Sequence, residues 1–292
     1  MMSRLHYRGI CFALLLVLLS TVVPPLSAQE SPSDPVLDLM AQMSPEAKVG
    51  QLVIVTFAGT DIGPGSEIVS LIRDYQIGGV LLRPGNGNLT SPSTSSSSGS
   101  SALASSSGIS AGELISITNR LQAIAWESAN VAATPIVEDD TILPASSPYV
   151  PLLIGMTSAE NGIAPVSLVT GTSPLPTPLA LGATWDPSLS ETVGAVLGRE
   201  ISALGINLYL GPDLDILYTP RPGDPADLGT QVFGGDPYWV GEMGTAHIRG
   251  LHEGSAGRLL VVPRHLPGLG SADRPLEEEV PTVQKPLEML KQ

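Results

Sequence analysis

Apolar runs of strand length recur along the chain, and each is followed by an amphipathic or a polar segment. A continuous apolar run of about four to eight residues is typical of a strand that is buried on both faces of a parallel sheet. Five such runs predict strands, at residues 51–57, 78–82, 149–156, 206–210 and 259–262.

Helices are predicted between these strands. Residues 66–75 place Ile68, Leu71 and Ile72 on one face, as in an amphipathic helix. Other helices are expected at residues 113–129, 186–204 and 236–251, and a patch of helical spacing lies within 31–43. At three predicted helix starts, a capping side chain is followed by a proline, which is favoured in the first helical turn. These starts are Ser44-Pro45, Asp186-Pro187 and Asp236-Pro237.

Alternation of strands and helices over this length indicates a parallel α/β sheet. The chain lacks the glycine fingerprint of a dinucleotide-binding fold, which favours a (β/α) barrel. A full barrel has eight βα units in about 250 residues. We therefore expect an incomplete (β/α)8 TIM-type barrel with about five to six units, and a further strand beyond Gln292.

The first 28 residues have the pattern of a secretory signal peptide. Arg4 and Arg8 precede the apolar residues 10–23, and a cut is expected near Ala28. The prediction is a secreted or extracytoplasmic protein, with an uncleaved membrane anchor as the alternative. Cys11, the chain's single cysteine, lies inside this segment, so the mature chain has no thiol for a disulfide, a metal site or a nucleophile.

Composition divides the rest of the chain. Residues 29–43 are a short lead, 44–292 form the predicted barrel domain, and 84–112 read as a Ser/Gly-rich insertion. The formal charge is −14 and 14% of residues are charged. So acidic a chain is not expected to bind nucleic acid or an anionic membrane surface, whereas a neutral sugar is a compatible partner.

Cofactor and metal motifs are missing from the sequence. No phosphate-binding loop and no H-E-x-x-H occurs. Asp213 and Asp215 have a spacing that could bind a metal, but a loop acid bonded to backbone is the more usual role of such a residue. We therefore expect no cofactor and no metal.

Candidate chemistry gathers in the loops that follow the predicted strands. His265 comes just after the strand 259–262, in a loop that Pro267 and Gly268 constrain. Such loops carry the active sites of β/α proteins. Glycoside hydrolysis needs a proton donor and a carboxylate, and His265 with Asp273 could form such a pair, although a structural histidine is the simpler alternative. The other strand-end acids are Asp213, Asp215 and Asp236.

Several phrases, in this order, make the chain similar to the N-terminal barrel of glycoside hydrolase family 3, especially its β-N-acetylhexosaminidase-like branch. The phrases are GQLVIVTF, YQIGGVLL, PLLIGM, PLALGATWDPSLSETVGAVLGREISALGIN, LGPDLDI, VFGGDPYWVG and RHLPGLG, and the last corresponds to the family's K-H-F-P-G-H-G. The resemblance implies a retaining glycosidase with its site at the carboxyl ends of the strands.

The resemblance also assigns residues. His265 matches the histidine of the family's Lys-His pair, which contacts substrate hydroxyls, and Arg264 replaces the lysine. Asp215 keeps the positioning acid after the fourth strand, and Asp273 alone remains of the D-x-H that supplies the acid/base histidine and its partner. Three further family positions are changed: Thr157 replaces a sugar-gripping Asp, Gln231 an Arg, and Leu269 a second His.

The expected function is hydrolysis of β-linked N-acetylhexosaminides or glucosides. Substrate binding is expected at Asp215, Arg264 and His265, with Asp273 assisting the acid, and the resemblance places the nucleophilic Asp beyond Gln292. The alternative is a carbohydrate-binding or degenerate barrel of a divergent branch that has lost turnover. An unrelated barrel enzyme is a third interpretation.

Overall fold

The computed structural model describes residues 34–90, 108–130, 137–138, 141–142, 148–159, 164–222, 224, 227–266, 268–270, 272–274, 282–283 and 286–290. The chain separates into two units, Met1–Met43 and Ser44–Gln292. In the first unit, helix α2 (Pro35–Gln42) begins at Asp34, whose carboxylate accepts the N–H of Val36. The predicted signal peptide and its cleavage point lie outside the described residues.

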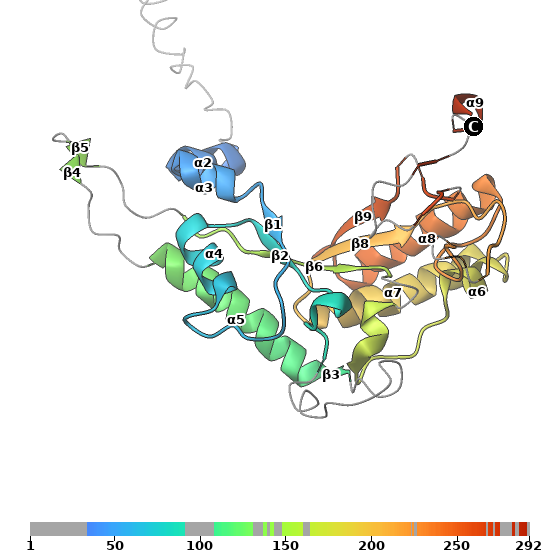
Figure 1. Ribbon diagram of the computed structural model, residues 1–292, viewed down its shortest axis with the longest axis horizontal. Coiled ribbons are helices and arrows are strands. Elements are labelled where there is room, and N and C mark those ends of the chain that lie inside the picture. Colours follow the sequence, from blue (N-terminus) through green and yellow to red (C-terminus); the bar gives the residue numbers. More distant parts are fainter. Residues whose placement is uncertain are drawn as a thin grey trace, which may run out of the picture. The chain divides into compact units, whose positions relative to one another are not determined.

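The second unit is built on a five-stranded parallel sheet (Figure 1). Neighbouring strands follow one another in the sequence with no reversal of order, as in a barrel and unlike a doubly wound sheet. The prediction of an α/β fold with about five parallel strands is confirmed. In sheet order they are β1 (Ile54–Val55), β2 (Gly79–Leu81), β6 (Leu153–Thr157), β8 (Leu208–Asp213) and β9 (Leu260–Arg264).

Helices connect these strands at most of the predicted positions. The side chains of Ser44, Asp186 and Asp236 each accept a backbone N–H of the first turn, which confirms the three predicted caps. The helices are α3 (Pro45–Gly50), α4 (Glu67–Tyr75), α5 (Ala111–Asn130), α6 (Pro178–Gly182), α7 (Pro187–Ala203), α8 (Pro237–Gly254) and α9 (Leu287–Leu290). Shorter elements are the 3-10 turns η1 (Pro84–Asn86) and η3 (Pro165–Leu168) and the strands β3 (Ile109–Ser110), β4 (Val137–Glu138), β5 (Thr141–Ile142) and β7 (Val169–Thr170).

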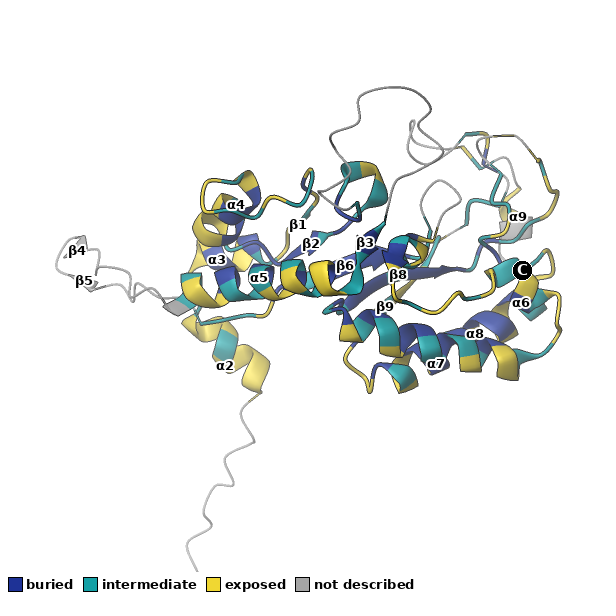
Figure 2. Cartoon of the chain, turned by 90° about the horizontal axis from the view of Figure 1, so that it is seen from below, coloured by how far each residue is buried: buried dark blue, intermediate teal, exposed yellow. Residues whose placement is uncertain are grey.

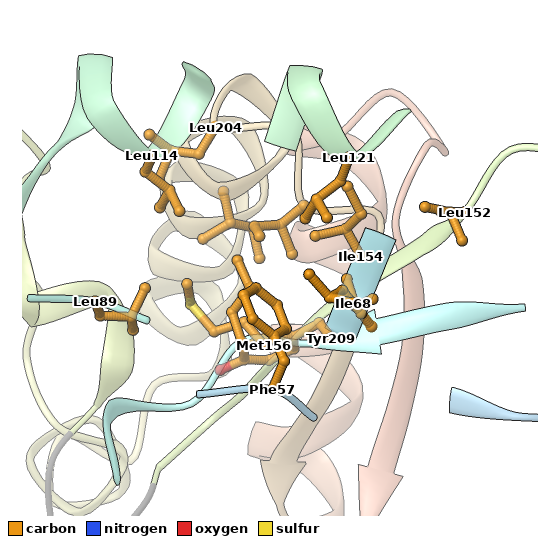
Figure 3. Close-up of a cluster of buried hydrophobic side chains, with 14 of the residues drawn as sticks. Phe57, Ile68, Leu89, Leu114, Leu121, Leu152, Ile154, Met156, Leu204 and Tyr209 are labelled. Carbon is orange, nitrogen blue, oxygen red and sulfur yellow. The ribbon is translucent and has the colours of Figure 1, made fainter. Parts of the chain in front are cut away.

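The main core lies between the sheet and its helices. Ile154 and Met156 of β6 and Tyr209 of β8 project to this side, where they meet Ile68 of α4 and Leu121 of α5 (Figure 3). Helices α7 and α8 run side by side along the sheet, with their buried residues toward it (Figure 2). Alternate strand residues therefore point into a helix-covered layer.

The opposite face of the sheet is partly exposed. Leu260 pairs in register with Leu208 and Val262 with Leu210, and both alternate with Val261, which packs on the core. Leu260 is 52% exposed, Val262 41% and Ile54 46%. The expectation that every strand is buried on both faces is therefore wrong for β1 and β9, because they are the edge strands of the described sheet.

The predicted first strand is also shorter than expected. Only Ile54 and Val55 of residues 51–57 pair with β2, while residues 51 and 52 form a turn after α3. Leu52 is therefore 85% exposed. An apolar composition alone did not reveal where the pairing begins.

The predicted insertion at residues 84–112 has ordered ends. The buried amide of Asn88 donates to the carbonyls of Phe57 and Gly59, and Thr90 bridges Gly108. Strand β3 and the start of α5 also fall within this range. The flanks are therefore part of the fold, and residues 91–107 lie outside the described part.

Helices α7 and α8 approach closely because glycines line their contact. A Cβ added at Gly194 or Gly198 of α7 would collide with the backbone of His247 or Leu251 of α8. Glycines of α8 meet the backbone of α7 in the same way, and they are Gly250 and Gly254. This contact fixes the helix pair under β8 and β9. None of the helices in the described ranges has both the length and the apolar character needed to cross a membrane.

Candidate functional site

The carboxyl ends of β8 and β9 bring four predicted residues to one edge of the sheet. Asp213 and Arg264 end these strands and lie opposite each other in register. Asp215 and His265 follow them in the adjoining loops. This is the edge at which parallel α/β folds place their binding sites.

His265 is held by Asp215. Its Nδ1 lies 2.7 Å from Oδ2 of Asp215, and the N–H of Leu269 donates to the other carboxylate oxygen at 2.5 Å. The Asp215 side chain is fully buried, whereas that of His265 is 20% exposed. Because a carboxylate accepts, Nδ1 carries the proton, and Nε2 is the nitrogen left for a further partner.

Arg264 binds Asp213 with two nitrogens. Its Nε lies 2.5 Å from Oδ1 and its terminal NH2 group 3.4 Å from Oδ2, and that group also donates to the carbonyl of Ala159 at 2.8 Å. The hydroxyl of Ser158 donates to Oδ1 at 2.7 Å. Both charges are therefore matched within the chain. The peptide bond between Arg264 and His265 is cis.

Asp273 lies in a different environment. It pairs with Arg274 at 3.0 Å and accepts the N–H of Thr282 at 2.8 Å. The hydrogen bond from Arg274, followed by that from Thr282, lowers the pKa of Asp273, so this carboxyl is ionised at neutral pH. The pairing of His265 with Asp273 is not observed, because the register of β8 and β9 gives His265 a different carboxylate, Asp215.

Asp236, the other strand-end acid, has a structural role. Its carboxylate accepts the N–H of Trp239 at the start of α8. The Trp239 ring contacts that of Trp185, which precedes α7, with centroids 5.0 Å apart. Because helices α7 and α8 run antiparallel to the strands, this aromatic pair lies on the carboxyl side of the sheet. Trp185 is 58% exposed.

A cavity of about 560 Å³ lies beside this edge, on the helix-covered side of the sheet. Thr157, Gln231 and Asp213 line it, so two of the changed family positions face the same cavity. Asp215, Arg264 and His265 are not among its lining residues. The predicted substrate-binding residues thus do not line this cavity, although Arg264 is bonded to Asp213, which does.

The sequence reasoning missed two polar residues of this cavity, His247 and Tyr209. His247 of α8 is buried, and its Nδ1 lies 3.2 Å from the carbonyl of Ser190. Burial lowers the pKa of His247 to about 4, so the ring is neutral at pH 7. Burial, with a contribution from Asp213, raises the pKa of Tyr209. Thr157, already singled out as a changed family position, has a buried Oγ1 with no hydrogen-bond partner among the described residues.

The position of His247 within α8 could have predicted its burial from the sequence. Met243, His247 and Leu251 follow one another at intervals of four residues in α8, and all three are buried. This spacing puts His247 on the apolar face of the helix. By contrast, no local pattern marks Thr157 as unpartnered.

The strands of the parallel sheet keep their chain order, and polar residues gather at their carboxyl ends. Both features are those of a (β/α)-barrel domain. The model of the Glycosyl hydrolase family 3 N terminal domain matches residues 44–292. The chain therefore belongs to glycosyl hydrolase family 3.

Two curated relatives are β-glucosidases by name. The probable beta-glucosidase K of Emericella nidulans is 40% identical over 76 residues, which cover 26% of this chain and 9% of that protein. The thermostable beta-glucosidase B of Acetivibrio thermocellus is 34% identical over 85 residues, covering 29% and 11% respectively. The matched segments thus span about a tenth of these relatives.

One solved structure supports the same family, and a second supports the fold. A glycoside hydrolase family 3 beta-N-acetylglucosaminidase from Paenibacillus sp. is 26% identical with a TM-score of 0.63, over 85% of this chain and 38% of that one. A beta-N-acetylhexosaminidase from Beutenbergia cavernae agrees in fold, at 24% identity and a TM-score of 0.52, over 80% and 56% respectively. The chain corresponds to less than two thirds of either protein.

Proposed function

We propose that this protein is a glycosidase that hydrolyses β-linked glycosides with retention of configuration. The observation that carries the proposal is the His265–Asp215 pair on adjoining strand-end loops of a family 3 domain. The buried carboxylate fixes the ring, and His265 presents Nε2 to a sugar hydroxyl. This arrangement suits substrate positioning rather than proton transfer.

Arg264 and Asp273 receive secondary roles in the proposal. The guanidinium has five N–H donors, and Nε and one NH2 group are engaged by Asp213 and Ala159. We assign the other terminal nitrogen, NH1, to the substrate. Asp273, ionised by its pairing with Arg274, would support a neighbouring acid rather than donate a proton itself. No described residue is assigned as the nucleophile.

The names of the relatives give the sugars to test. Two are named β-glucosidases and one solved structure a β-N-acetylglucosaminidase. The full chain is assayed for release of 4-nitrophenol from the β-glucoside and the β-N-acetylglucosaminide. Release of the phenol from either supports the proposal, and its absence from both contradicts it.

A second candidate is a carbohydrate-binding domain without turnover. The observation that favours it is the mutual pairing of Arg264 and Asp213, beside the uncharged replacements Thr157 and Gln231. Calorimetric titration with chitin oligosaccharides and peptidoglycan fragments tests it. Binding heat without hydrolysis supports this candidate, and the absence of heat removes it.

A further inference from the structure

We propose that the cavity beneath residues 164–178 is a binding site for an uncharged, mainly apolar small molecule that carries one hydrogen-bonding group. We name residues 164–178 the covering segment. The site is separate from the His265–Asp215 pair and does not depend on glycoside hydrolysis.

The cavity has the size and the walls of a small-molecule site. Its volume of about 560 Å³ lies within the range of about 300–1,000 Å³ that such sites occupy. Met156 and Tyr209 come from the sheet, while Val193 and Leu197 come from α7. Exposed residues of the covering segment, such as Ser173, form its outer part. An apolar molecule would restore contacts that this wall lacks when empty.

Thr157 supplies the polar end. It is 7% exposed, lines the cavity, and has a hydroxyl without a partner among the described residues. A buried polar atom without a hydrogen bond costs free energy, which a bound hydroxyl or carbonyl group would recover. The ligand class therefore includes one such group.

The ionisable lining residues disfavour an ionic ligand. Asp213 already accepts hydrogen bonds from Arg264 and Ser158. Burial lowers the pKa of His247 to about 4, so it offers no positive charge at pH 7. A charged ligand would lose its hydration without gaining a counter-ion in this cavity.

The cavity and the proposed sugar site also differ in chemistry. Asp215, Arg264 and His265 offer charged and hydrogen-bonding groups, and none of them lines the cavity. The surface that lines the cavity is mainly apolar, a poor match for a sugar that carries a hydroxyl on most of its carbons. Loss of glycosidase activity would therefore leave this proposal intact.

The test uses the full chain and the uncharged dye N-phenyl-1-naphthylamine. We expect a saturable rise in dye fluorescence at one site per chain. We also expect 2-naphthol to displace the dye at concentrations at least about tenfold lower than 2-naphthoate, its charged analogue. Absence of saturable dye binding, or equal displacement by the two compounds, would overturn the proposal.

Two valines of α7 give a matched pair of variants. Val193→Phe fills the cavity, whereas Val196→Phe makes the same change at a half-buried position that does not line it. We expect dye affinity to fall at least about tenfold in the first variant and to be retained in the second. Equal effects would place the dye elsewhere, for example on the exposed face of the sheet, and would refute the site.

Thr157→Val keeps the side-chain shape and removes the hydroxyl, so it tests the polar end without opening a void. We expect displacement by 2-naphthol to weaken about fivefold, while displacement by naphthalene changes by less than about twofold. If Val193→Phe does not fold, Thr157→Val still tests the proposed site. Equal weakening of both compounds, or of neither, would overturn the assignment of Thr157.

Discussion

At the scale of single residues, two histidines of this chain are held in opposite ways. His265 is partly exposed and paired with a buried carboxylate, whereas His247 is buried against a carbonyl and the ring of Phe233. The first arrangement orients a ring for an external partner. The second keeps a ring neutral inside the protein. Each leads to a measurable consequence.

Asp215→Asn is predicted to lower kcat/KM by about 10–100-fold if the proposed glycosidase activity is present. The amide can still accept the N–H of Leu269, but its NH2 group opposes the proton on Nδ1 of His265 and disfavours the observed tautomer. Steady-state kinetics on the aryl β-glycosides measure the effect. Asp74→Asn, at an exposed position on α4, is the control and should retain wild-type kinetics.

His247 is predicted to make the protein less stable in acid. Burial lowers its pKa from 6.5 to about 4, so the unfolded chain binds this proton more readily than the folded one. Above pH 6.5 the ring is neutral in both states and the free energy of unfolding is unaffected. As the pH falls from 6.5 toward 4, the free energy of unfolding decreases by about 3 kcal/mol in total, because the unfolded chain takes up the proton first. Urea denaturation across this interval measures the loss.

His247→Gln should show a smaller loss over the same pH interval, because the amide does not titrate. His252→Gln, at an exposed position on the same helix, is the control and should follow the wild type. Parallel profiles for His247→Gln and the wild type would show that this histidine does not set the acid stability.

At the scale of elements, the contact between α7 and α8 depends on residues without side chains. Alanine is normally the better helix former by about 1 kcal/mol. At Gly198, however, the added Cβ would meet the backbone of Leu251. Helix propensity therefore predicts that alanine stabilises the protein at this position, whereas packing predicts that it destabilises the protein. We expect the effect of packing to be the larger one.

Gly198→Ala is predicted to lower the free energy of unfolding by about 2 kcal/mol, since the two helices must separate. Gly241→Ala, in α8, has open space around the new Cβ and should raise it by about 0.5–1 kcal/mol. Chemical denaturation of both variants provides the comparison. A stabilised Gly198→Ala protein would show that the helix contact can relax.

The elements also show which features the sequence could predict. Apolar runs and Asp-Pro helix starts are local, so the strands and the caps of α7 and α8 follow from neighbouring residues. The partner of His265 depends on the register between β8 and β9, which no local pattern contains. Composition assigned Asn88 to a loop. The residue is nevertheless buried, and its side chain donates hydrogen bonds to the carbonyls of Phe57 and Gly59, about thirty residues earlier in the chain.

At the scale of the whole molecule, the predicted signal peptide implies a processed and exported protein. We propose a secreted or extracytoplasmic location, a lead at residues 29–43 and a barrel domain at 44–292. Expression in a host with a general secretion pathway is predicted to give a mature N-terminus at Gln29, as N-terminal sequencing would show. Arg4→Glu with Arg8→Glu should reduce export. An intact N-terminus in the membrane fraction would favour the uncleaved anchor.

The edge contact between Trp185 and Trp239 gives the molecule an optical property. Two of its three tryptophans meet with their ring planes at 86° to each other, on the carboxyl side of the sheet. Transitions of two indoles this close couple, so the pair should produce a near-ultraviolet dichroism band that an isolated indole lacks. Sugars or other ligands that reach this side would change the band without any label. The protein thus carries a spectroscopic reporter on the same side of the sheet as its candidate site.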